Sequence, residues 1–216
     1  SSFNLNSLQD KFGYYDSNWG GAYKIQMTEA EAVAKGYTVI KTASEFVSKI
    51  NANKSGKFML MGDIDFSGMS YSSISGFTGT LDGNGYSIKK LTQKGSANQG
   101  LFASTGDGAV IKNLTLEKFN IGSTSYANGY GAALIATVQG SLTLDNIRLK
   151  DSNIYGLYAG GLITDVSQAI TNAQIRLNNI TVDSTVKVQG EHAAGVIYRS
   201  MASDSASSVV ISNVIC

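Results

Sequence analysis

The stretch Ile111-Lys112-Asn113-Leu114-Thr115-Leu116 decides the fold, because similar hexapeptides follow it at residues 144–149, 177–182 and 211–216. The asparagines of the four copies lie 33, 33 and 34 residues apart in the chain. A fixed period of this length is typical of a solenoid, in which each repeat packs on its two neighbours. The spacing therefore predicts stacked turns of one repeated unit.

Each copy alternates apolar and polar residues, and the phase of the alternation changes at the asparagine. Alternation at period two is typical of a half-buried strand, and a phase shift of one residue requires a bend. Asparagine suits a bend because it tolerates a left-handed backbone, and its amide both donates and accepts hydrogen bonds. We therefore expect a ladder of stacked amides formed by Asn113, Asn146, Asn179 and Asn213.

A second motif, a small residue followed by two apolar ones, precedes each asparagine at residues 100–102, 133–135, 161–163 and 195–197. The apolar residues supply core, and the small residue allows close packing of the backbone. An earlier, degenerate unit covers residues 80–92, and there we expect Lys90 to replace the ladder asparagine. This unit is predicted to be the first rung of the solenoid.

The N-terminal region differs in kind. Thr28 with Glu31, and Thr42 with Glu45, are capping-box pairs that predict two short helices. We assign residues 1–56 to a helical cap and residues 57–216 to the repeats. The predicted fold is all-β: a right-handed parallel β-helix with a small helical N-terminal cap. The last copy breaks off partway through a rung, so we expect the natural polypeptide to continue, with Cys216 in a core position.

Composition limits the partners. The chain has 17 basic and 16 acidic residues and a formal net charge of +1, so we expect no nucleic-acid partner. One cysteine and one histidine cannot build a usual zinc site, and we expect no metal and no cofactor. The longest apolar runs are too short to predict a membrane-spanning segment.

The repeats resemble a known family. The small-Leu-Ile motif with its Asn-centred strand, and a lead-in through residues 36–40, 61–65 and 77–85, are similar to the GLUG-type repeats of bacterial secreted and surface proteins. The resemblance covers about residues 36–216, although Ala133 stands in place of the motif glycine in the second unit. It implies a parallel β-helix within an adhesin-like or haemagglutinin-like exported protein, and hence a secreted or cell-surface location.

A column of aromatic residues is the candidate binding site. Tyr130, Tyr158 and His192 each stand four residues before the middle residue of the second motif, so the register stacks them along one edge. Tyr126 and Tyr155 lie in tyrosine-rich turns nearby. Such a column could dock a glycan or a protein surface, since tyrosine offers rigid amphipathic area. Stacking that serves stability alone is the other interpretation.

The sequence Asp82-Gly83-Asn84-Gly85 allows a calcium site, with Asp63 and Asp65 as further ligands, or a tight glycine-rich turn. We favour the turn, and calcium binding at Asp82 and Asn84 stays open.

Parallel β-helices also include polysaccharide lyases and hydrolases, which need converging charged groups. The candidates are Asp145, Arg148, Asp151, Asp165 and Arg176. In register Asp145 aligns with Lys112, Asn178 and Ser212, so no carboxylate pair recurs there, and His192 has no defensible triad partners. An ice-binding array would need regular threonines, which Arg148 and Ile215 interrupt.

We therefore expect a structural or adhesive module, not an enzyme, that presents loops to a glycan or protein. An insertion in a filament protein such as a flagellin is a variant of this expectation. A β-helical carbohydrate-active enzyme is the alternative.

Overall fold

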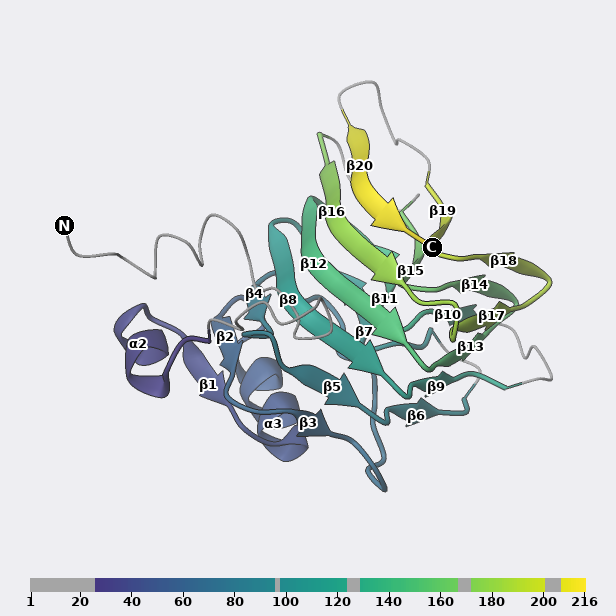
Figure 1. The fold of residues 1–216 in the computed structure, drawn as a ribbon. Helices are drawn as coiled ribbons and strands as arrows, with labels where there is room; N and C mark the ends of the chain where they lie inside the picture. Colours follow the sequence, from purple (N-terminus) through teal and green to yellow (C-terminus); the bar gives the residue numbers. More distant parts are fainter. Residues whose placement is uncertain (1–25, 96–97, 124–128, 167–171, 201–206) are drawn as a thin grey trace.

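The computed structural model describes residues 26–95, 98–123, 129–166, 172–200 and 207–216 (Figure 1). The chain forms a parallel β-helix with a helical N-terminal cap, as predicted. Each pair of strands joined within the described residues is parallel.

Four sheets run along the solenoid. The largest contains β1 (Thr38–Ile40), β2 (Lys57–Leu60), β4 (Thr80–Asp82), β8 (Ala109–Glu117), β12 (Leu142–Lys150), β16 (Gln174–Val182) and β20 (Ser208–Ile215), with β3 (Ile64–Asp65) and β5 (Ser87–Lys89) beside them. The second contains β6 (Thr92–Gln93), β9 (Asn120–Ile121), β13 (Asn153–Tyr155) and β17 (Lys187–Gln189). The third contains β10 (Tyr130–Gly131), β14 (Tyr158–Gly160) and β18 (His192–Ala194). The fourth contains β7 (Phe102–Thr105), β11 (Ile135–Val138), β15 (Ile163–Asp165) and β19 (Ile197–Arg199).

Each turn of the chain visits every sheet once, as β11, β12, β13 and β14 do in sequence. The repeat fixes the register: Leu144 pairs with Ile111 on one side and Leu177 on the other. The second motif is aligned in the same way, because Ile135 lies between Phe102 and Ile163. Equivalent apolar residues therefore stack from rung to rung.

The four repeat asparagines all adopt a left-handed backbone, with φ between 52° and 56°. The Nδ2 of Asn146 donates to the Oδ1 of Asn113 at 3.2 Å, and Asn179 donates to Asn146 at 3.2 Å. Asn213 departs from this pattern, because its Nδ2 donates at 2.8 Å to Asn178 rather than to Asn179. Together Asn113, Asn146, Asn179 and Asn213 are called the Asn ladder below.

The prediction that Lys90 replaces the ladder asparagine is wrong. Asp82 pairs with Lys112 and Ser87 pairs with Thr115, so the bend equivalent to Asn113 falls between β4 and β5, where Asn84 has a φ of 51°. Lys90 instead follows the pair of Lys89 with Glu117 and aligns with Lys118. A second left-handed bend thus exists, formed by Lys90, Lys118 and Asp151 at φ of 60°, 56° and 50°.

The cap comprises α2 (Glu29–Ala34) and α3 (Ala43–Ala52), at the N-terminal end of the solenoid in Figure 1. Thr28 and Thr42 cap them by accepting from the backbone N–H three residues ahead, at 3.2 and 3.1 Å. The ring of Phe46 in α3 lies 5.6 Å from that of Phe66 and 6.4 Å from that of Phe102. Helix α3 therefore closes the interior of the first rungs.

The proposed boundary at residues 56–57 lies inside one sheet. Strand β1 of the cap pairs with β2 of the repeats, joining Thr38 to Phe58. Phe46 and Ile50 of α3 also belong to the same buried cluster as the leucines of the rungs. The division into cap and repeats remains a description of two parts that share a sheet and a core.

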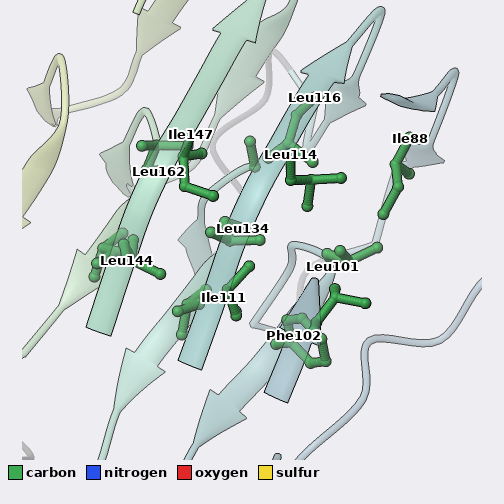
Figure 2. Packing of buried hydrophobic residues seen from close by; sticks show 14 of the residues in the cluster. Ile88, Leu101, Phe102, Ile111, Leu114, Leu116, Leu134, Leu144, Ile147 and Leu162 are labelled. Atoms are coloured by element: carbon green, nitrogen blue, oxygen red, sulfur yellow. The ribbon is translucent and has the colours of Figure 1, made fainter. Parts of the chain in front are cut away.

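The interior is a stack of aliphatic layers. Figure 2 shows Leu101, Leu134 and Leu162 from three successive turns beside Ile111 and Leu144 of the large sheet. These side chains are 0% exposed, and burying each one stabilises the fold by roughly 1.5–3 kcal/mol.

The last strand differs from these layers. In β20, Val210, Ile211 and Ile215 are 54%, 48% and 61% exposed. Cys216 is exposed too, so the expectation of a core position is wrong, because no described strand packs on the outer side of β20.

Candidate functional site

The structure brings Tyr130, Tyr158 and His192 together on adjacent strands. Tyr130 pairs with Tyr158 across β10 and β14, and Tyr158 pairs with His192 across β14 and β18. The Tyr130 and Tyr158 rings meet edge-on with centroids 5.6 Å apart, whereas Tyr158 and His192 are stacked 5.0 Å apart at an interplanar angle of 8°. These three residues are called the aromatic column below, and they lie at the end of the molecule away from the cap (Figure 1).

Tyr198, which the sequence did not single out, extends the column. Its ring centroid lies 5.4 Å from that of Tyr158 and 5.8 Å from that of His192, although it belongs to β19 in a different sheet. A tight glycine corner makes this contact possible, because a Cβ on Gly160 would collide with the carbonyl oxygen of Ile163. The chain therefore passes from β14 to β15 through only two residues. The third and fourth sheets meet closely at this corner, which allows the rings of Tyr158 and Tyr198 to touch.

The sequence did not single out Arg199 either. Its guanidinium is fixed beside the column by three hydrogen bonds. Its Nε donates to Oδ1 of Asp165 at 3.1 Å and its Nη2 donates to Oδ2 at 2.7 Å. Nη2 also donates to the Tyr130 hydroxyl at 2.9 Å. The Asp165 carboxylate raises the pKa of Arg199 above its ordinary value, chiefly through these hydrogen bonds. The column, Tyr198 and Arg199 are called the aromatic site below.

Exposure within the aromatic site is graded. The side chain of Asp165 is 1% exposed and that of Arg199 is 36% exposed, so the carboxylate lies beneath the guanidinium. Tyr130, Tyr158 and Tyr198 are half-buried, and His192 is exposed. Parallel stacking covers the facing sides of Tyr158 and His192, so their edges are the parts left for a ligand. Such a surface combines apolar ring area with hydroxyl, imidazole and guanidinium groups.

Of the two flanking tyrosines, the structure describes Tyr155, which makes no ring contact with the aromatic column among the described residues. Tyr155 is half-buried in β13, and its carbonyl oxygen packs so closely on Gly122 and Gly131 that neither could carry a Cβ without a clash. This tight contact explains two glycines of the tyrosine-rich turns. Tyr126 lies outside the described residues.

The oxygens of the Asp82–Asn84 turn are engaged in protein hydrogen bonds. The Asn84 side chain is fully buried: its Oδ1 accepts from the Met27 N–H at 2.8 Å, and its Nδ2 donates to the carbonyls of Met27 and Leu60 at 2.9 and 3.2 Å. Oδ1 of Asp82 accepts from Asn84 N–H at 2.8 Å and from Asn113 Nδ2 at 3.2 Å. The turn therefore fastens the cap to the first rung.

The proposed additional calcium ligands are also engaged. Asp63 forms an ion pair with Lys89 at 2.9 Å, and Asp65 accepts from the N–H of Ser67 at 2.8 Å. Over the part of the chain that the structure describes, no group of three or more His, Cys, Asp or Glu residues is placed to hold a metal ion.

The charged candidates for a carbohydrate-active enzyme are spread over several sheets. Arg148 on β12 makes a bidentate pair with Asp183, at 3.0 and 2.7 Å. Asp145 on the same strand accepts from Asn178 Nδ2 at 3.1 Å, and Asp165 lies on a different sheet, paired with Arg199.

The remaining two candidates are equally separate. Arg176 is exposed on β16, in register with Thr143 of β12. Asp151 forms the second bend, where its N–H donates to Thr185 Oγ1 at 2.9 Å. The structure therefore pairs several of these five residues with partners of their own and gathers no set of them around a common point.

Comparisons with known proteins identify no family. No family model matches the chain, and no curated protein matches its sequence. A solved structure described as a "putative immunoglobulin A1 protease from Bacteroides ovatus" is similar, at 15% identity and a TM-score of 0.47, over 92% of this chain and 79% of that one. That description contradicts the expectation that this chain is not an enzyme, and we withdraw the expectation. Within the described residues, no helix has the length and apolar character needed to cross a membrane.

Proposed function

We propose that this chain is an adhesive β-helix module of a secreted or cell-surface protein and that it binds a glycan through the aromatic site. The observation that carries the proposal is the convergence of Tyr130, Tyr158, His192 and Tyr198 on one edge, with Arg199 fixed beside them. Four aromatic rings and a guanidinium gathered from two sheets are more than the fold requires, because the interior is already filled by aliphatic side chains.

The chemistry of the site favours a sugar as the ligand. Sugar rings present apolar C–H faces together with many hydroxyl groups, and tyrosine offers both an apolar ring and a hydroxyl that donates and accepts. The rings are anchored on strands of a packed solenoid, so little side-chain entropy is lost when a ligand binds. A protein ligand is the competing possibility and is an outcome of the test below.

The surrounding fold suits rigid display. Stacked apolar layers and a closed N-terminal end make a stiff body, and repeat proteins use such bodies to present extended binding surfaces. The likeness of the repeats to GLUG-type sequences supports a place in a larger exported protein. We propose an adhesin-like surface protein or a filament protein as that parent.

A glycan array probed with the wild-type chain and with a Tyr130→Ala, Tyr158→Ala, His192→Ala triple variant tests the proposal. We expect the wild type to bind a defined set of glycans and the triple variant to lose that binding while its β-rich circular dichroism stays intact. Tyr37→Ala is the matched control, because Tyr37 is a half-buried tyrosine that lies in the cap and not in the column. The Nζ of Lys57 lies 4.3 Å from the centroid of its ring.

The opposite results would overturn the proposal. Glycan binding that survives in the triple variant would make the column a stabilising stack only. Absence of glycan binding by the wild type would remove the glycan as ligand, and capture of a purified surface protein by the wild type alone would establish a protein ligand instead. New reducing ends or unsaturated products in the bound glycan would replace the adhesive module with a carbohydrate-active enzyme.

A further inference from the structure

Arg199 differs from the other surface arginines in being fixed next to an aromatic surface. The bidentate contact with Asp165 and the hydrogen bond to the Tyr130 hydroxyl use three of its five N–H groups. No described residue accepts from the two N–H groups of Nη1, and the side chain is 36% exposed. A guanidinium oriented in this way offers an open, charged donor edge whose position is already set.

The carboxylate beneath Arg199 explains how that edge is held. Asp165 is 0% exposed and pairs in register with Arg199 between β15 and β19. A buried carboxylate paired with a half-exposed arginine locks the plane of the guanidinium, as charge-assisted bidentate contacts do. The ordering of a long side chain is thus complete before any ligand arrives, which removes a usual cost of binding.

The charges around this edge determine how strongly an anionic ligand should bind. Asp165 neutralises Arg199 overall, and exposed Glu191 stands one residue before His192. A ligand anion would therefore be held mainly by directional hydrogen bonds to the guanidinium, beside the rings of Tyr130 and Tyr158. A carboxylate suits this donor because one of its oxygens can accept a charge-assisted hydrogen bond from Nη1, whose two N–H groups diverge and do not form a bidentate fork.

We propose that Arg199 makes the aromatic site selective for acidic glycans, whose sugar carboxylate docks on the open edge of the guanidinium while the sugar ring packs against the aromatic column. This inference rests on the proposed glycan binding and names the class of glycan. Asp165 is then a positioning residue, since it holds the guanidinium of Arg199 in place.

The test compares binding of an oligogalacturonate with binding of its fully methyl-esterified form, which has the same sugar ring without the charge. We expect the wild type to prefer the free acid by about tenfold or more. A sulfated neutral oligosaccharide forms a third arm, which distinguishes a sugar carboxylate from another sugar-borne anion. The preference should disappear in an Asp165→Asn, Arg199→Gln double variant, which replaces the ion pair with two amides and so leaves no buried charge unpaired.

Arg148 and Asp183 supply a matched control. Their bidentate pair has nearly the same geometry, with distances of 3.0 and 2.7 Å, but Arg148 lies on the large sheet, which is not one of the two sheets that carry the aromatic site. An Arg148→Gln, Asp183→Asn double variant should keep the tenfold preference.

Several results would overturn the inference. Equal binding of the acid and the ester by the wild type would do so while leaving glycan binding itself established. An unchanged preference in the Asp165–Arg199 double variant would place the acid contact elsewhere, and preference for the sulfated arm alone would exclude the carboxylate. Failure of the wild type to bind any glycan would instead remove the proposed function.

Discussion

The Asn ladder and the aromatic column are two stacks built by the same repeat, and they differ in what their side chains contact. In the ladder, the amide of Asn146 bonds to residues of the ladder on both sides, and Asn113 is only 5% exposed. In the column, the three residues are of two types, and the exposure rises from half-buried Tyr130 to exposed His192. The ladder also becomes exposed along the stack, at Asn179 and Asn213, so the two stacks differ in residue identity and in the contacts they make and not in burial. Identical residues joined by amide hydrogen bonds accompany a role in folding, whereas mixed residues in ring contacts accompany a role at the surface.

The two stacks also end differently. The ladder loses its regular pattern at Asn213, whose amide reaches Asn178 of the preceding rung instead of Asn179. At the same end the column gains Tyr198, which contacts Tyr158 and His192 from a second sheet, whereas Arg199 of that sheet reaches back to Tyr130. In the C-terminal rungs the ladder hydrogen bonds are less regular and the surface carries an additional aromatic ring. We therefore expect the proposed binding to be most sensitive to substitutions in these rungs.

Replacing Asn146 should give the largest effect on stability. Asn146→Ala removes two ladder hydrogen bonds and places at a left-handed bend a residue that tolerates this backbone less well than asparagine does, so we expect the free energy of unfolding to fall by about 2–4 kcal/mol. Urea unfolding followed by circular dichroism measures this change. Asn146→Gly is the matched control, because glycine relieves the backbone strain and should recover about 1 kcal/mol of the loss.

The same substitution at the end of the ladder should cost less. Among the described residues, the Asn213 side chain makes a single hydrogen bond, to exposed Asn178, so Asn213→Ala should lower the free energy of unfolding by about 1–2 kcal/mol, mostly through backbone strain. A loss equal to that of Asn146→Ala in the same urea experiment would show that the ladder does not weaken toward this end.

Removing one hydroxyl from the column should have a smaller effect on folding. Tyr130→Phe deletes the acceptor of one Arg199 hydrogen bond but keeps the ring and the Asp165 pair, so we expect a loss of about 0.5–1 kcal/mol. Differential scanning calorimetry can measure it. A loss of unfolding free energy as large as that of Asn146→Ala would show that the column stabilises the fold as the ladder does, and the two stacks would then not differ in role.

Acid should affect the N-terminal part before either stack. The N–H of Lys41 and the ammonium of Lys49 lower the pKa of Glu45 below its ordinary value, and hydrogen bonds from Ser67 lower the pKa of Asp65 in the same way. A lowered folded pKa gives stability that is present above the unfolded pKa and is lost as the pH falls through the folded value. We therefore expect a small loss below about pH 4.5, since both groups are solvent-accessible. Urea unfolding at pH 6 and pH 3.5 would reveal it, and Glu45→Gln should reduce the difference.

Much of the fold could be predicted because the repeat carries its own register. The spacing of the asparagines placed β8, β12, β16 and β20 side by side, and the same spacing placed Tyr130 next to Tyr158 and His192. The bend at residues 83–86 was harder to predict from the sequence. The first rung bends over four residues between β4 and β5, whereas each later rung bends at one asparagine. The segment at residues 88–92 resembles the segment at residues 111–115, so the prediction placed the bend at Lys90.

The rest of the site depended on geometry that the spacing alone does not give. Tyr198 reaches Tyr158 only because the glycine corner after β14 brings two sheets together. A signal for Arg199 did exist, since Asp165 and Arg199 each stand two residues after the last residue of the second motif. Opposite charges at equivalent positions of adjacent rungs predict an ion pair, and this comparison would have found it.

The most direct measurement determines stability and glycan affinity together for two variants, Asn146→Gly and the Tyr130→Ala, Tyr158→Ala, His192→Ala triple. We predict that Asn146→Gly is destabilised by about 1–3 kcal/mol through the loss of its ladder hydrogen bonds and binds glycan as the wild type does. The triple variant should keep its fold and lose binding at least tenfold. If both variants instead lost binding in proportion to stability, the ladder and the column would be parts of one folding framework, and the aromatic site would not be a binding site.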